Sequence, residues 1–80
     1  MGQFKKLLRK YIQKIGVNIV TFSSEIGVSS STVYNWLNGV TLPDLKTLLQ
    51  LADRLEALTG EQYEEILTKL VISIPRRSDA

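Results

Sequence analysis

The side chains best suited to chemistry in this sequence are hydroxyl and amide groups near its middle, spaced as on one face of a helix. At about 100° per residue they fall within a sector of roughly 140°. They are Ser30, Ser31, Tyr34, Asn35 and Asn38. Because each can donate or accept hydrogen bonds, the spacing predicts a short helix that presents hydrogen-bonding groups to a partner.

The other side of the same helix is apolar. Val33, Trp36 and Leu37 fall between roughly 240° and 340° around the helix axis and form a face that can dock on a core. An indole at an inward position of a short helix is most often a core anchor, so we interpret Trp36 in that way rather than as a residue that stacks on a nucleic acid. The helix therefore has one side for packing and one for recognition.

The segment before this helix has the residues of a second short helix. Asn18 can act as its N-cap, and Phe22 and Ile26 lie four residues apart on one face. Gly27 follows the last apolar residue, where a left-handed residue ends a helix at least cost. Ser29 can cap the next helix. A helix, a turn that contains glycine and a capped second helix form the helix-turn-helix signature.

Over roughly residues 17–55 the sequence resembles the phage repressor and Cro type of helix-turn-helix transcriptional regulators, an XRE-like family. The resemblance is carried by EIGVSSSTVYNWLNG and by the LPDLKTLLQLADRL that follows. It implies an all-α fold, a compact five-helix domain of the lambda-repressor-like DNA-binding type. It also implies double-stranded DNA as the partner.

Two positions depart from the pattern of that family. Ile19 stands just after the Asn18 cap, where relatives often carry a Gln that reaches DNA phosphates. Leu37 follows Trp36, where relatives often have an acidic residue. The first departure removes one expected backbone contact, and the second indicates an additional apolar contact, within the chain or across a dimer.

Apolar periodicity and helix caps predict the elements of the whole chain. Helices are expected at about residues 2–15, 19–26, 30–38, 45–57 and 60–72, in one domain of residues 1–74 with a tail at 75–80.

The two later helices carry the clearest local signals. Asp44 can cap the fourth helix, and Thr59 with Gln62 fits a capping box for the fifth. Five apolar residues are assigned to one stripe of the fourth helix, and three acidic residues to the outer face of the fifth. These are Leu45, Leu48, Leu49, Ala52 and Leu55, and Glu61, Glu64 and Glu65.

The composition excludes several classes of site. The chain has no Cys and no His, which excludes disulfides, zinc-finger coordination and imidazole or thiol catalysis. No apolar run approaches the length of about 18 residues that crosses a bilayer. We therefore expect a cytoplasmic protein with no membrane contact, no metal and no cofactor. The resemblance to phage repressors implies that it is bacterial or phage-encoded.

The net charge of +2 is unevenly distributed. Residues 1–38 carry five basic side chains and one acidic one, which gives +4, whereas residues 39–80 carry five basic and seven acidic ones, which gives −2. The basic half holds the recognition helix, as binding to a polyanion would require.

A helix-turn-helix inserts the N-terminal part of its second helix into the major groove, where amide and hydroxyl groups can read base edges. The expected base-reading residues are Ser30, Ser31, Tyr34 and Asn35, of which Asn35 can make a bidentate contact to adenine. The expected contacts to the DNA backbone are Asn18, Ser29, Asn38, Lys14, Thr41 and Lys46. The expected dimer contacts are Leu37, Val40 and Leu42, which could instead fold back onto the core.

Together these features predict a sequence-specific DNA-binding transcriptional regulator and not an enzyme. Its most plausible mode is a homodimeric repressor on a palindromic operator, with residues 30–38 in the major groove. The alternative is a protein–protein interaction module, antitoxin-like or polymerase-binding, because no Lys or Arg lies between residues 15 and 45.

Overall fold

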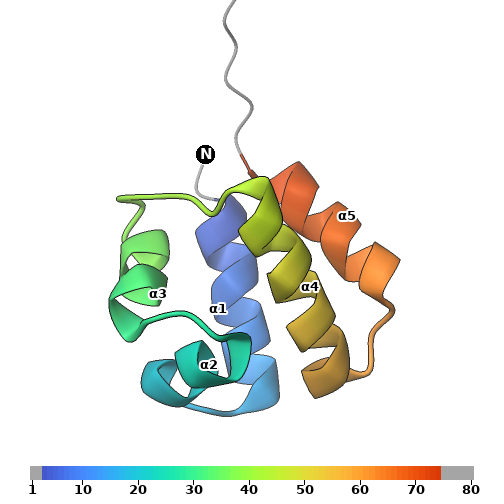
Figure 1. Ribbon diagram of the computed structural model, residues 1–80, viewed down its shortest axis with the longest axis horizontal. Coiled ribbons are helices and arrows are strands. Elements are labelled where there is room, and N and C mark those ends of the chain that lie inside the picture. Colours follow the sequence, from blue (N-terminus) through green and yellow to red (C-terminus); the bar gives the residue numbers. More distant parts are fainter. Residues whose placement is uncertain (1–2, 75–80) are drawn as a thin grey trace, which may run out of the picture.

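The computed structural model describes residues 3–74, which form five α-helices and no strand (Figure 1). In chain order these are α1 (Gln3–Ile15), α2 (Ile19–Ile26), α3 (Ser30–Leu37), α4 (Leu45–Thr59) and α5 (Tyr63–Ser73). The prediction of an all-α, five-helix architecture is confirmed. The predicted tail at residues 75–80 lies outside the described residues.

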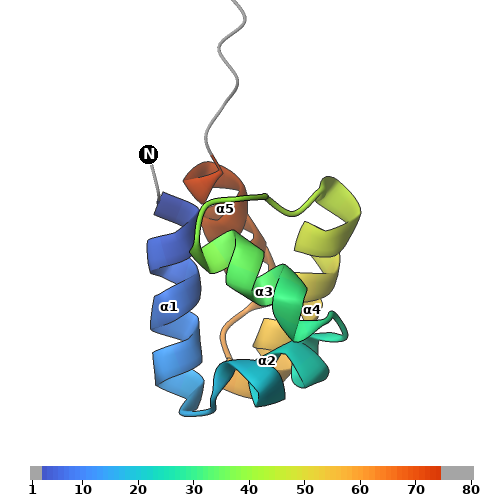
Figure 2. The ribbon, with the colours of Figure 1, turned by 90° about the vertical axis from the view of Figure 1, so that its left-hand side faces the viewer.

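The short helices α2 and α3 lie on one side of the domain and α5 on the other, with α1 and α4 between them (Figures 1 and 2). α1 packs against α3, α4 and α5, and α2 packs against α3 and α4. None of the described helices is long and apolar enough to cross a membrane.

One hydrophobic core receives side chains from all five helices. Its buried residues are Phe4, Leu8, Tyr11, Phe22, Ile26, Val33, Trp36, Leu37, Leu48, Leu51, Ala52, Leu55, Ile66 and Leu70. The Trp36 ring meets the Phe4 ring edge to face, with centroids 6.1 Å apart and an interplanar angle of 80°. Trp36 is only 3% exposed, so the interpretation of this indole as a core anchor is confirmed.

The stripe predicted for α4 is partly wrong. Leu48 and Leu55 are buried as expected, but Leu45 is 66% and Leu49 40% exposed. The buried face of α4 consists of Leu48, Leu51, Ala52 and Leu55, so it is rotated away from Leu45 and Leu49 and toward Leu51. Apolar spacing alone does not fix the centre of the buried face, because the leucines of this helix extend around more than one side.

The start predicted for the last helix is also wrong. Thr59 belongs to α4, where its hydroxyl donates to the Leu55 carbonyl at 2.8 Å and accepts the Glu61 N–H at 3.2 Å. The expected capping box therefore does not form, and α5 begins at Tyr63 instead of residue 60. The Tyr63 N–H donates to the Glu56 carboxylate at 3.1 Å. A side chain of α4 thus supplies an acceptor for a backbone N–H in the first turn of α5.

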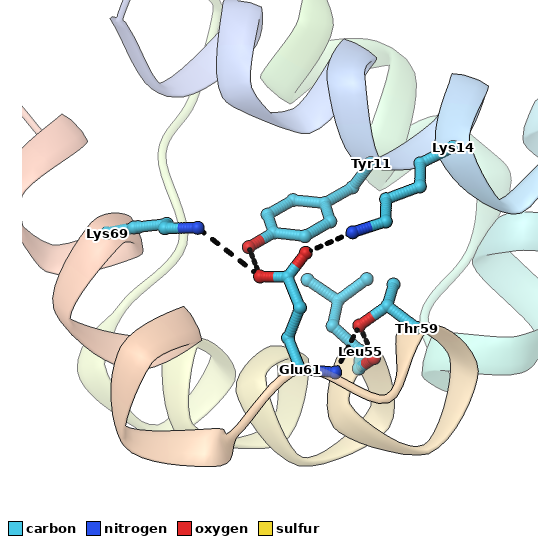
Figure 3. A network of polar contacts seen from close by, with 6 residues as sticks. All are labelled: Tyr11, Lys14, Leu55, Thr59, Glu61 and Lys69. Atoms are coloured by element: carbon cyan, nitrogen blue, oxygen red, sulfur yellow. Dashed lines mark hydrogen bonds and ion pairs between the residues drawn. The ribbon is translucent and has the colours of Figure 1, made fainter.

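Glu61 lies in the loop between α4 and α5, not on the outer face of α5 as predicted, and joins three elements (Figure 3). Its Oε2 accepts from Lys14 Nζ at 2.6 Å, and its Oε1 accepts from Tyr11 Oη at 3.2 Å and from Lys69 Nζ at 3.3 Å. Its side chain is 20% exposed. One carboxylate thus connects α1, the loop and α5.

The network around Glu61 shifts the pKa values of two of its members, Glu61 and Tyr11. Hydrogen bonding to Lys14, with smaller contributions from Lys69 and Tyr11, lowers the pKa of Glu61 below its ordinary value of 4.5. Burial, together with the negative charge of Glu61, raises the pKa of Tyr11 to about 12. Both shifts favour the charge states in which the network is formed.

Replacing Glu61 with Gln is expected to lower the melting temperature at neutral pH. As the pH is lowered, the melting temperature of this variant should fall less steeply than that of the parent protein. A lowered carboxylate pKa contributes stability above the ordinary value, and that stability is lost as the pH falls through the lowered value. Melting curves followed by circular dichroism between neutral pH and about pH 3 would measure this. Glu64→Gln makes the same charge change at an exposed position. Identical acid profiles for the two variants would contradict the role of Glu61.

Candidate nucleic-acid interface

The two short helices each begin at a side-chain cap. The Asn18 amide oxygen accepts the Thr21 N–H at 2.8 Å and opens α2. Ser29 Oγ accepts the Thr32 N–H at 3.2 Å and lies 2.9 Å from Thr32 Oγ1 at the start of α3. Both caps predicted from the sequence are present. They fix where the two helices start and leave the positive ends of the helix dipoles at the surface.

The turn between the helices depends on Gly27. Its φ of +92° lies in the left-handed region, which permits its N–H and that of Val28 to donate to the Ser23 carbonyl at 2.9 and 3.0 Å. Gln50 on α4 adds a contact that the sequence did not predict, because its Nε2 donates to the Ile26 carbonyl at 2.7 Å. The end of α2 is therefore tied to α4 as well as closed by its own backbone.

α3 lies at the surface of the domain (Figure 2), and its polar face is on the outer side. Ser31, Tyr34 and Asn35 are exposed, Tyr34 to 48%, and Ser30 is half-buried. On the opposite face the apolar residues of α3 are all buried. The four residues expected to read bases are thus held together on one short helix, and none of them is packed into the core.

The residues predicted to contact the DNA backbone divide into two groups. Asn18 and Ser29 are exposed at the helix starts, Asn38 is exposed at the end of α3, and Thr41 and Lys46 are exposed at and after the following loop. The sixth, Lys14, differs from these. Its ammonium is paired with Glu61 at 2.6 Å, although its side chain remains 54% exposed.

Of the expected dimer contacts, Leu37 is corrected and the other two are available. Leu37 is 4% exposed and belongs to the core, so it offers almost no surface to a second subunit. Val40 is 68% and Leu42 47% exposed. The exposed leucines at the start of α4 extend this surface, which we call the loop patch: Val40, Leu42, Leu45 and Leu49.

The described residues contain no group of three or more His, Cys, Asp or Glu side chains that could hold a metal ion. α3 itself presents hydroxyl and amide side chains and contains no Asp or Glu. Such groups can bind and discriminate by hydrogen bonding.

Comparison with known families agrees with this geometry. A family profile described as helix-turn-helix matches residues 8–60, which run from the middle of α1 through the end of α4. Comparisons with curated proteins and with solved structures gave no significant match.

Gly27→Ala is expected to destabilise the domain by more than Gly16→Ala does. Both glycines have positive φ, so a side chain costs about 1–2 kcal/mol at either position. At Gly27 the new Cβ would also lie 2.9 Å from Gln50 Nε2, whereas at Gly16 it would meet nothing within 4 Å. Displacing Gln50 adds the loss of one hydrogen bond, about 1 kcal/mol.

Urea denaturation of both variants, each also made in a Gln50→Ala background, measures this difference. The excess cost at Gly27 should disappear when Gln50 is absent. Equal costs at the two glycines in the parent protein would show that Gln50 does not hold the turn.

Proposed function

This chain belongs to the helix-turn-helix family of the Cro/C1 or XRE-like type and is a DNA-binding transcription regulator; from that premise we propose that it is a repressor that binds a palindromic operator as a dimer. The observation that carries the proposal is the outward polar face of α3, which is rigidly backed by buried Val33, Trp36 and Leu37.

In this proposal α3 enters the major groove, which is about 12 Å wide and admits one helix. Asn35 makes a bidentate contact to an adenine, and Ser30, Ser31 and Tyr34 add hydrogen bonds to neighbouring base edges. Serine hydroxyls can both donate and accept, so they discriminate less sharply than the amide. The operator is therefore expected to show one strongly required adenine in each half-site.

Cationic side chains that contact phosphates must come from outside α3, since no Lys or Arg lies between residues 15 and 45. The exposed ends of α2 and α3, at Asn18 and Ser29, can bind phosphate oxygens through backbone N–H groups. Asn38, Thr41 and Lys46 can add contacts at the other end of α3.

Besides Lys14, which is paired with Glu61, we propose two further residues of α1 as backbone contacts, Lys5 and Arg9. Both are exposed, and at about 100° per residue they lie on the flank of α1 opposite to Leu7 and Lys14. Leu7 and Lys14 line a groove together with α5 residues, so the flank with Lys5 and Arg9 is directed toward α3. A cation in that position can reach the DNA backbone beside a groove that holds α3.

The sparse charge near α3 favours a dimer, because two subunits double the number of phosphate contacts. The loop patch supplies an apolar surface next to the end of α3, as a symmetric contact between two copies would need. Such a dimer places its two reading helices about 34 Å apart, one turn of the duplex.

The second candidate function is a protein–protein interaction module, antitoxin-like or polymerase-binding. The observation that favours it is the loop patch, which could receive a different protein instead of a second copy. A variant with Ala at Asn35 and Ser31 distinguishes the two, since only the regulator loses its binding to DNA.

Asn35→Ala is expected to weaken binding to a duplex selected from a random pool by roughly 10- to 100-fold, because a bidentate base contact contributes about 1–3 kcal/mol. Electrophoretic mobility shifts would measure the affinity, with Gln13→Ala on the exposed side of α1 as the control. The variant should also lose its preference for adenine at one position. Unchanged affinity and sequence preference would contradict the assignment.

Leu42→Ser combined with Leu45→Ser is expected to convert a dimer into a monomer without lowering the melting temperature, because both side chains are already exposed. Sedimentation equilibrium measures the mass, and Val20→Ser, at a 61% exposed residue of α2, is the matched control. The double variant should still bind a single half-site. A parent protein that remains monomeric while it saturates a two-half-site duplex would refute the dimer.

A further inference from the structure

A groove runs between α1 and α5, separate from the α3 surface. Its first part encloses about 440 Å³ and is lined by Lys6, Leu7, Lys10, Lys69 and Ile72, among others. A second part of about 290 Å³ shares three of these residues. The groove therefore continues along the length of α1, from its first turn to its last. We call this the α1–α5 groove.

The α1–α5 groove combines a cationic rim with apolar contacts. Lys6 and Lys10 are exposed on α1, and neither takes part in the ion pairs formed among residues 3–74. Ile72 on α5 is 75% exposed, and Leu7 lies partly buried across from it. Among residues 3–74, Glu61 is the one carboxylate that lines the groove, and Lys14 and Lys69 already surround it. Glu64 and Glu65 line an adjoining hollow on the other side of Lys69.

From this arrangement we propose that the α1–α5 groove binds an acidic amphipathic helix of another protein. The apolar side of such a helix covers Leu7 and Ile72, and its carboxylates meet Lys6 and Lys10. This partner is additional to DNA, and the proposal does not depend on the DNA sequence that α3 reads.

The length of the groove fits such an occupant. α1 has 13 residues, which at about 1.5 Å per residue extend roughly 20 Å. A partner helix of about three to four turns would cover that length. Helix-in-groove binding of this kind uses apolar anchors on one face of the bound helix, and the charged rim selects the sign of its partner.

DNA fits the same groove less well. Proteins contact the sugar-phosphate backbone with cations, polar side chains and backbone N–H groups, so an exposed isoleucine in the groove gains nothing from it. The groove also lies on the α5 side of α1, whereas α3 packs on another side of that helix.

The test uses a fluorescein-labelled helical peptide of 15 residues, with Leu at every third or fourth position and Glu between. Fluorescence anisotropy should show saturable binding to the full chain. A peptide with the same Glu residues and Ser in place of each Leu should bind at least about tenfold more weakly, since it lacks the apolar anchors.

Two pairs of protein variants locate the peptide. Lys6→Glu combined with Lys10→Glu, and separately Ile72→Ser, should each weaken peptide binding at least about tenfold. Arg54→Glu on α4 and Val71→Ser on α5 are the matched controls, because they make similar changes at exposed residues that do not line the groove. Both control variants should retain peptide binding. Circular dichroism verifies that every variant is folded.

Several results would overturn the proposal. These are no saturable binding, equal binding of the all-polar peptide, or equal loss in the control variants. Peptide binding that occurs only as a dimer dissociates would identify a second copy as the occupant instead. Competition between the peptide and DNA, with loss of DNA binding in the Lys6 and Lys10 variant, would identify the groove as part of the DNA surface.

Discussion

The structure depends on the contacts that hold the buried side of α3 against α1 and the turn before it against α4. Its Trp36 packs edge to face on Phe4 of α1, while the turn before it is tied to α4 by the hydrogen bond from Gln50 to the Ile26 carbonyl. Eight residues are too few to form a stable helix alone in water, so tertiary contacts must provide most of its stability. They also set its rotation, because burying the apolar side leaves the serine, tyrosine and asparagine side chains outside.

The rest of the domain supports this arrangement from a distance. Glu61 joins Tyr11 and Lys14 of α1 to Lys69 of α5, and so closes the side of the core that lies away from α3. It also pairs Lys14 and Lys69 within the α1–α5 groove, whereas Lys6 and Lys10 line the same groove without an ion pair among residues 3–74. We propose that the five cations of α1 divide between two partners, with Lys5 and Arg9 on the side of α3 and Lys6 and Lys10 on the side of α5.

Much of this fold could be predicted from the sequence, because caps, glycine turns and apolar periodicity are local signals. Asn18, Gly27 and Ser29 fixed the limits of α2 and α3, and the polar side of α3 followed from spacing alone. What the sequence could not give were contacts between distant residues. Gln50 meets Ile26 across 24 positions and Lys14 meets Glu61 across 47, and neither pairing has a local signature. Leu45 and Leu49 were misassigned for a related reason, since a leucine-rich helix does not reveal which leucines face the core.

We propose that the exposed side of α3 contacts DNA bases while α1 reaches the DNA backbone with Lys5 and Arg9. The most direct measurement is a titration of the ¹⁵N-labelled protein with a duplex selected from a random pool, followed by nuclear magnetic resonance. We expect that the amide signals of residues 29–35 shift most, that those around Lys5 and Arg9 follow, and that the signals of α5 do not move. Shifts concentrated on α5 and the α1–α5 groove, with α3 unchanged, would contradict this proposal.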